Sequence, residues 1–308
     1  MTGKKIGIIG REGEEHCERM KKVFQGLKAS PYIIDLYKFP ESIEISSWDG
    51  IVKFKGKILN DFLAFYVRTV PVGIPPVGPR ESLPKKIWEA DYLIERERHS
   101  FLCSLINSLS LRGKLVVNPV SSFDLHFLKL YQIEILSLKG IPMPVTLVTN
   151  SPKEVKAFKK KFGEIVYKPV AGGASCQLMA KEDFSPERMS ELKNAPVLFQ
   201  EYIDGDNIRA YVVGDKIVAS VIIHTKAVDY RGAEERLEPI VLPRKIQKLC
   251  VKAKNLCGLH FSGIDLKRQK NGRYVFIECN PSPMFVGFEN LTGLKVSEEL
   301  AKYILRNA

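Results

Sequence analysis

Residues 261–280 read FSGIDLKRQKNGRYVFIECN, two runs of high β propensity joined at Asn271-Gly272. Asn-Gly between such runs is typical of a two-residue type I′ turn in a β-hairpin. That turn places Asp265 directly opposite Glu278, and Asn280, two residues further along, faces the same way. The sequence therefore predicts an antiparallel hairpin that carries these three polar side chains on one face.

Two directly opposed carboxylates destabilise a hairpin unless something neutralises them. A proton, the neighbouring Lys267 or a bound cation would do so. Two carboxylates and an asparagine carbonyl form an all-oxygen set of the kind that Mg²⁺ prefers. A polar surface hairpin without a metal is the alternative, and a longer loop at Asn271 would break the pairing. The opposite face is predicted to belong to the core, with Ile264, Leu266, Val275, Ile277 and Cys279.

A second hairpin is predicted around Gly214-Asp215, between residues 208–213 and 216–224. A two-residue turn there places Arg209 opposite Ser220. Apolar side chains alternate with Arg209 along the first of these strands. One face of the strand is therefore expected to lie in the core, and the other carries the arginine.

The first third of the chain alternates apolar strands with amphipathic helices. Strands are predicted at 5–9, 32–36, 63–67 and 115–117, a small hairpin around Gly56, and helices at 14–27 and 87–109. This alternation predicts a mostly parallel sheet with helices on its faces. One further helix is expected from Ser121 or Ser122 to Lys139, where Gly140 ends it. From residue 198 onward the pattern is antiparallel, so we expect an α/β (α+β) chain with parts at 1–118, 119–196 and 197–308.

Composition narrows the class of protein. The chain has 308 residues, of which 45% are hydrophobic and 27% are charged, and this excludes disorder over most of its length. No apolar run approaches the ~18 residues that a membrane-spanning helix needs. Six scattered cysteines without a Cys-x-x-Cys pair argue against a zinc site or a disulfide framework, so a reducing cytoplasm is expected.

The net charge of +12 suits a nucleic acid, a membrane surface or a polyanionic small molecule such as ATP. The basic side chains are spread along the chain, and the one run, Lys159 to Lys161, ends a predicted helix, where cations suit the helix dipole. A solvated basic surface is therefore favoured over a nucleic-acid groove, and no nucleic-acid or membrane partner is expected.

Several short motifs resemble those of the RimK-like ATP-grasp ligases, a family of carboxylate–amine ligases. Residues 276–283, FIECNPSP, resemble the family's metal-binding strand E-x-N-x-S-P, and residues 258–265 resemble its strand with the first metal-binding aspartate. Further matches lie at 200–203, 207–214, 229–231 and 288–293, and a loose one at 66–69. Their order and spacing along the last two thirds of the chain carry the resemblance.

The resemblance implies an ATP-grasp fold, in which an N-terminal parallel-sheet domain precedes two α+β subdomains that enclose ATP. It also implies roles for individual residues. Mg²⁺ or Mn²⁺, with two ions expected, would bind Asp265, Glu278 and Asn280. The nucleotide would contact Lys129, Lys168, Gln200, Glu201, Tyr202, Ile203 and Asn207. Arg209 and Arg231 would neutralise the phosphates, and Arg68 would either bind a substrate carboxylate or cap its strand.

The activity implied is the ATP-dependent joining of a small-molecule carboxylate to an amine through an acyl phosphate, with ADP as a product. An amino acid such as glutamate would be added to a small molecule, a coenzyme or a peptide, and a homo-oligomer is left open. The basic charge also suits an ATP-grasp kinase of small molecules such as inositol phosphates. Two departures from the family, Asn207 in place of aspartate and Ala233 in place of asparagine, suit a nucleotide-binding module without catalysis.

Overall fold

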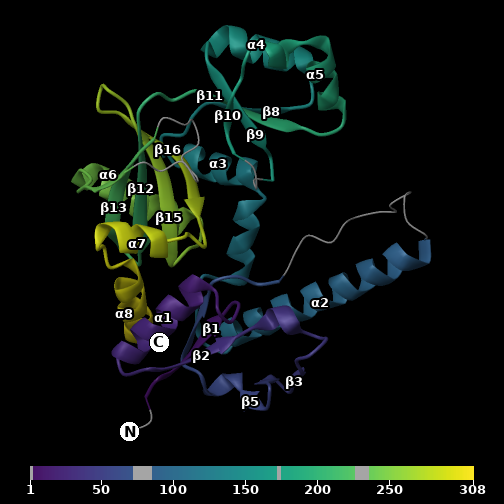
Figure 1. The fold of residues 1–308 in the computed structure, drawn as a ribbon, viewed down its shortest axis with the longest axis vertical. Coiled ribbons are helices and arrows are strands. Elements are labelled where there is room, and N and C mark those ends of the chain that lie inside the picture. Colours follow the sequence, from purple (N-terminus) through teal and green to yellow (C-terminus); the bar gives the residue numbers. More distant parts are fainter. Residues whose placement is uncertain (1–2, 72–84, 172–174, 226–235) are drawn as a thin grey trace. The chain divides into compact units, whose positions relative to one another are not determined.

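The computed structural model describes residues 3–71, 85–171, 175–225 and 236–308, with the backbone alone at 85–88. The chain forms two compact units, one of Met1–Ser121 with Ser297–Ala308 and one of Ser122–Val296. Figure 1 labels most of the helices and strands. Among the described residues, no helix combines the length and the apolar character needed to cross a membrane.

The N-terminal unit is built on a parallel four-stranded sheet in the order β2-β1-β6-β7. Its strands are β1 (Lys5–Ile9), β2 (Ser30–Ile34), β6 (Ala64–Val67) and β7 (Leu115–Val117), and its helices are α1 (Glu15–Gly26), α2 (Lys85–Leu111) and α8 (Val296–Asn307). The central strands β1 and β6 are almost entirely buried, as expected for a parallel sheet covered on both faces. The parallel sheet predicted from the strand–helix alternation is confirmed.

A small antiparallel sheet accompanies the parallel one in the N-terminal unit. It consists of β3 (Ile45–Trp48), β4 (Ile51–Phe54) and β5 (Lys57–Ile58). The turn between β4 and β5 has Lys55 and Gly56 at positive φ, and so the predicted hairpin around Gly56 is confirmed. Strand β3 was not predicted from the sequence.

The second unit contains two sheets, of which the first has the order β10-β9-β11-β8. Its elements are β8 (Thr146–Thr149), α4 (Pro152–Phe162), β9 (Ile165–Pro169), β10 (Gln177–Leu178), α5 (Pro186–Ser190) and β11 (Val197–Glu201). Its core includes Val155 of α4, Ile165 of β9 and Phe199 of β11. Strand β11 completes this sheet, although it lies just beyond the expected boundary at 196; the three-part division stays a prediction.

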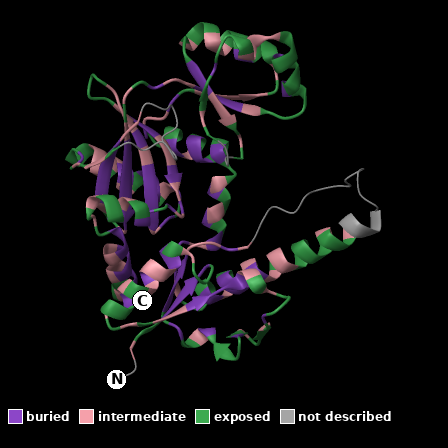
Figure 2. Ribbon diagram, viewed as in Figure 1, coloured by how far each residue is buried: buried purple, intermediate pink, exposed green. Residues whose placement is uncertain are grey.

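The second sheet of this unit is antiparallel and has the order β14-β13-β12-β15-β16. Its strands are β12 (Asp206–Val213), β13 (Lys216–His224), β14 (Arg236–Pro239), β15 (Phe261–Arg268) and β16 (Tyr274–Asn280), and α3 (Lys129–Leu138), α6 (Arg244–Leu256) and α7 (Val286–Thr292) accompany it. One face of the sheet packs a core with side chains of α3 and α6. Figure 2 shows the buried residues concentrated in the strands.

The hairpin of β15 and β16 has the predicted pairing but not the predicted turn. Near the turn, Arg268 pairs with Tyr274, and Gln269 and Arg273 share a backbone hydrogen bond, so residues 270–272 form a three-residue loop. This loop shifts the register by one residue. A bulge at Ile277 shifts it back, so that Asp265 lies opposite Glu278 as predicted. The two-residue turn is therefore wrong, and the predicted carboxylate pair is confirmed.

The bulge also changes which side chains of β16 enter the core. Phe276 packs in the core cluster with Ile264, Leu266 and Cys279, whereas Val275 and Ile277 are not part of it. The core position expected for Ile277, the bulged residue, is therefore wrong, since its side chain is only partly buried. Val275 is 1% exposed, and so its expected burial is confirmed although it lies outside this cluster. The core position of Cys279, beyond the bulge, is confirmed.

In the hairpin of β12 and β13, the predicted turn is correct and the predicted pairing of Arg209 is wrong. Its two-residue turn at Gly214-Asp215 is confirmed, since Val213 pairs with Lys216. A bulge between Tyr211 and Val212 then shifts the register, and Arg209 lies opposite Val221 rather than Ser220. The face of Arg209 is unaffected, because its own strand alternates as predicted.

The helix expected from Ser121 or Ser122 to Lys139 is divided. A 3-10 segment spans Val120–His126, and α3 then begins at Lys129. Gly140 follows the helix at φ +77°, which confirms its predicted end. The break makes Lys129 the first residue of α3, where its side chain lies close to β16 rather than on a continuous outer helix.

Candidate active site

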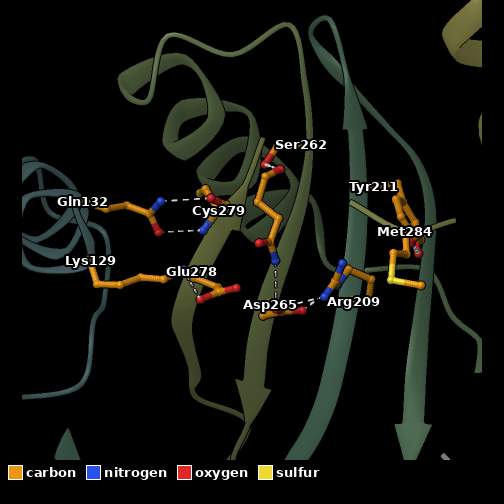
Figure 3. Close-up of polar contacts among 10 residues, drawn as sticks. Lys129, Gln132, Arg209, Tyr211, Ser262, Asp265, Glu278, Cys279 and Met284 are labelled. Atoms are coloured by element: carbon orange, nitrogen blue, oxygen red, sulfur yellow. Dashed lines mark hydrogen bonds and ion pairs between the residues drawn. The ribbon is translucent and has the colours of Figure 1, made fainter. Parts of the chain in front are cut away.

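Four charged residues, two adjacent carboxylates between two cations, form a row across the edge of the five-stranded sheet. Arg209 of β12 is the cross-strand partner of Asp265 on β15, and Asp265 is the partner of Glu278 on β16. Lys129 reaches Glu278 from α3. Figure 3 shows this order, with each carboxylate next to a cation. We call these four residues the charge row.

Arg209 and Asp265 form a two-point ion pair. The Nε of Arg209 lies 2.5 Å from Oδ1 of Asp265, and Nη2 lies 3.0 Å from Oδ2. Both side chains are largely buried, with 9% and 14% of their surface exposed. A planar guanidinium suits this bidentate geometry. The neutralising group for Asp265 is therefore Arg209; Lys267, one of the groups that the sequence suggested, donates instead to the carbonyl of Gly205.

Glu278 is neutralised from the helix side of the sheet. The Nζ of Lys129 lies 2.7 Å from its Oε2. Burial by itself would raise the pKa of Glu278, but the charges of Lys129, Lys168 and Arg209 together hold that pKa well below its usual range. Glu278 is therefore ionised at neutral pH. The contribution of Lys168, from β9, shows that the two predicted lysines act on the same carboxylate.

Asn280 lies beside the two carboxylates of the charge row and adds a third oxygen-bearing side chain. It pairs with Gly263 of β15, and its Nδ2 donates to Oδ2 of Asp265 at 3.4 Å. Glu278 accepts the hydrogen bond from Lys129 on Oε2, and its side chain is 21% exposed. The chemistry of this donor set therefore fits a hard divalent cation such as Mg²⁺, which binds oxygen and retains several of its own waters.

Gly263 allows the charge row to pack tightly. A Cβ built on Gly263 would lie 2.5 Å from Cβ of Pro283 and 2.8 Å from Nη1 of Arg209. The segment that follows Asn280 is held in place by Tyr211, whose hydroxyl donates to the carbonyl oxygen of Met284 at 2.7 Å. Neither Gly263 nor Tyr211 was singled out from the sequence, although each lies two positions from a member of the row, on the same face of its strand.

Gln132 is a further residue that sequence reasoning missed. It is 1% exposed, and its side-chain amide both donates to and accepts from the backbone of Cys279, at 2.9 Å in each case. The signal was its spacing, since residues three apart on a helix share a face and Gln132 follows Lys129 by three. Cys279 itself lies between Glu278 and Asn280.

The residues predicted to contact adenine lie at the end of β11 and just beyond it. Gln200 is buried, and its Nε2 donates to the hydroxyl of Thr146. Glu201 accepts a hydrogen bond from the backbone N–H of Val145 on Oε1. Both side chains are thus engaged with β8 or the residue before it. Tyr202 is partly exposed and Ile203 is buried.

Asn207, predicted at the ribose side, lies near the start of β12. Its cross-strand partners are Ile223 and Lys267. It is two residues from Arg209 and therefore on the same face of the strand. Arg231 and Ala233 lie outside the described residues. The nucleotide roles of all these residues stay predictions.

Arg68 belongs to the N-terminal unit, where it follows β6. Its Nε donates to Oε1 of Glu14 at 3.1 Å, and its backbone N–H donates to Ile9. Burial would raise the pKa of Glu14, but hydrogen bonds from His16 and from the backbone of Cys17, with the charge of Arg68, lower it to about 2. Arg68 thus has an anionic neighbour of its own, and a substrate-binding role stays a prediction.

Comparison with known proteins places this geometry in a family. Residues 128–304, more than half of the chain, match the RimK-like ATP-grasp domain. The chain belongs to the RimK-like ATP-grasp family. This match contains all four members of the charge row.

Individual relatives agree with the family. The probable alpha-L-glutamate ligase 1 of Shewanella sp. (strain W3-18-1) is 31% identical over 217 residues, which cover 66% of this chain and 71% of that protein. The ATP-grasp ligase PsnB, solved with a phosphomimetic variant of its minimal precursor, Mg and ADP, is similar with a TM-score of 0.87 and 30% identity over 98% of each chain. The macrocyclase MdnC from Microcystis aeruginosa MRC shares the fold, with a TM-score of 0.80 and 21% identity over 98% of this chain and 99% of that one.

These findings confirm two of the predictions. The fold is the ATP-grasp fold, and the enzyme is an ATP-dependent ligase that forms carbon–nitrogen bonds. The relatives are named as ligases, so the comparisons support neither the kinase nor the module without catalysis.

Proposed function

We propose that this RimK-like ligase joins a peptide-borne carboxylate to an amine by way of an acyl phosphate and releases ADP and phosphate. The charge row is the observation that carries the proposal. A triphosphate carries several negative charges, and its site needs cations in fixed positions beside oxygen atoms that bind metal. The charge row offers both on one face of a sheet.

Asp265, Glu278 and Asn280 are the residues that would hold Mg²⁺. When bound there, the ion would neutralise charge on the phosphate oxygens. The charges of Lys129 and Lys168 favour the ionised form of Glu278 that a metal requires, and Arg209 forms a two-point ion pair with Asp265. Arg231 is kept as a phosphate-binding candidate from its sequence position.

The reaction follows from these groups in two steps. An oxygen of the substrate carboxylate attacks the γ-phosphorus of ATP, a new P–O bond forms, and the bond to the bridging oxygen of ADP breaks. The amine then attacks the acyl carbon, a C–N bond forms, the C–O bond to the phosphate breaks, and the amine loses a proton. Negative charge develops on oxygen in both steps, and fixed cations such as Arg209 stabilise it most strongly where water is excluded.

A peptide is the carboxylate substrate that the comparisons favour over the small molecule or coenzyme. PsnB, which is about 30% identical over nearly the whole chain, was solved with a minimal precursor and with precursor peptide PsnA2. Free glutamate as the amine is a second candidate, because curated relatives are named alpha-L-glutamate ligases. The two candidates differ in their products: an amide within the peptide in the first case, and a peptide extended by glutamate in the second.

An isotope experiment tests the reaction class. A candidate acidic peptide labelled with ¹⁸O in its carboxylates is incubated with the enzyme, ATP and Mg²⁺, with and without glutamate. We expect ADP, and phosphate that contains ¹⁸O. The product should lose one water if the amide forms within the peptide, and gain one glutamyl residue if glutamate is the amine. AMP with pyrophosphate, or a stable phosphorylated peptide, would contradict the proposal.

A further inference from the structure

Strand β16 carries both Glu278 and Asn280, and it lies at the edge of its sheet. An edge strand leaves a row of backbone N–H and C=O groups without a neighbouring strand, and such groups need partners when they are buried. Here two segments of the same unit provide partners. The backbone N–H of Phe276 donates to the carbonyl of Pro142, and Gln132 binds Cys279.

The amide of Gln132 takes the place of a residue in a neighbouring strand. Its Nε2 donates to the carbonyl oxygen of Cys279 and its Oε1 accepts from the N–H of the same residue, each at 2.9 Å. These two groups belong to the peptide bonds that link Cys279 to Glu278 and to Asn280. Gln132 therefore holds the backbone on both sides of Cys279.

The two hydrogen bonds between Gln132 and Cys279 lie close to the bulge that sets the register of the hairpin. The bulge at Ile277 shifts the strand by one residue, and Asp265 faces Glu278 only because of that shift. The hydrogen bonds that β16 makes at its free edge, from Phe276 to Pro142 and between Cys279 and Gln132, lie on either side of Ile277. Lys129 approaches Glu278 from one helical turn before Gln132, so one helix sets both contacts.

We propose that Gln132 is a positioning residue that fixes Glu278 and Asn280 for metal binding by clamping the backbone of Cys279. The proposal rests on the proposed function, since it assumes that the site binds Mg²⁺ with a nucleotide. Residues that orient metal ligands typically change metal affinity or activity 10- to 100-fold when replaced. Gln132 is expected to act in this range without touching the metal.

The test replaces Gln132 by methionine, which keeps the length of the side chain and removes both hydrogen bonds. Gln247→Met is the matched control, because Gln247, in α6, also donates from its amide to a backbone carbonyl, that of Leu242 just before the helix. Binding of Mg²⁺ is measured by calorimetry at a fixed concentration of ADP, together with the melting temperature of each protein. We expect Gln132→Met to weaken Mg²⁺ binding at least tenfold and Gln247→Met to leave it unchanged.

A second variant covers the case in which Gln132→Met does not fold. Gln132→Glu keeps the acceptor for the Cys279 N–H and loses the donor to its carbonyl, so we expect an intermediate loss of Mg²⁺ affinity. A folded Gln132→Met or Gln132→Glu protein that binds Mg²⁺ as tightly as the wild type would overturn the inference alone. A wild-type protein that binds no Mg²⁺ with ADP would instead overturn the proposed function.

Discussion

Lys129 and Glu278 are 149 positions apart in the sequence, and Nζ of the lysine lies 2.7 Å from Oε2 of the glutamate. The lysine was expected to face a nucleotide, and it also holds a carboxylate of the candidate metal site. Arg209 does the same for Asp265. Each carboxylate of the charge row therefore has its own cation, and the energetic effect of each substitution follows from this pairing.

Asp265→Ala is expected to destabilise the protein. From the sequence alone, removing one of two opposed carboxylates should relieve repulsion. In the structure it leaves the largely buried Arg209 without its two-point partner, which costs about 3–5 kcal/mol for a fully buried pair and somewhat less here. Urea unfolding measures the loss. The double variant Asp265→Ala/Arg209→Met should recover part of it, and an unchanged urea midpoint in Asp265→Ala would refute the pairing.

Lys129→Met and Lys168→Met should differ in their effect on the protein without ligand. Lys129 contributes more than Lys168 to the low pKa of Glu278 and forms the direct ion pair, so Lys129→Met should lower the melting temperature more. Both variants should show a smaller rise in melting temperature with Mg²⁺ and ATP, as mass action requires for weaker binding. An undiminished rise for Lys168→Met would remove Lys168 from the nucleotide site.

Gly263→Ala is expected to lower both stability and ligase activity. The new Cβ would lie 2.5 Å from Cβ of Pro283 and 2.8 Å from Nη1 of Arg209, so the arginine or the segment after Asn280 must move. Overpacking of this kind typically costs about 1–3 kcal/mol. Gly287→Ala, in α7, is the control, because nothing lies within 4 Å of its Cβ and alanine favours a helix. Equal stability of the two variants would contradict the prediction.

Glu14→Gln should destabilise the protein at neutral pH and have less effect in acid. The pKa of Glu14 is lowered from 4.5 to about 2, so its carboxylate stabilises the folded state above pH 4.5, and this stabilisation is lost as the pH falls toward 2. The difference in unfolding free energy from the wild type is expected to be on the order of 1–2 kcal/mol at pH 7, because solvent screens this partly exposed carboxylate. Urea unfolding at a series of pH values measures it. A difference that stays constant from pH 7 to pH 3 would show that the charge of Glu14 contributes nothing.

Much of the hairpin could be predicted from local signals. Alternation of apolar and polar residues identified both strands, Asn271-Gly272 marked the turn, and the pairing of Asp265 with Glu278 is confirmed. The loop has three residues, 270–272, rather than the two that Asn271-Gly272 predicted. The correct pairing of the two carboxylates depends on the bulge at Ile277. Turn preference is a local property, whereas a bulge depends on what packs against the strand.

The sequence by itself determined the parallel sheet of the N-terminal unit, the antiparallel strands of the second, and the face of Arg209, because side-chain alternation and turn residues act over a few positions. Only the tertiary structure decided that Lys129 neutralises Glu278 and that Gln132 holds Cys279. These contacts join residues almost 150 positions apart. Lys129 and Gln132 belong to α3, and the break in the chain before α3 had no signal in the sequence periodicity. Long-range contacts of this kind depend on how α3 and β16 pack on their shared core, and so no local pattern specifies them.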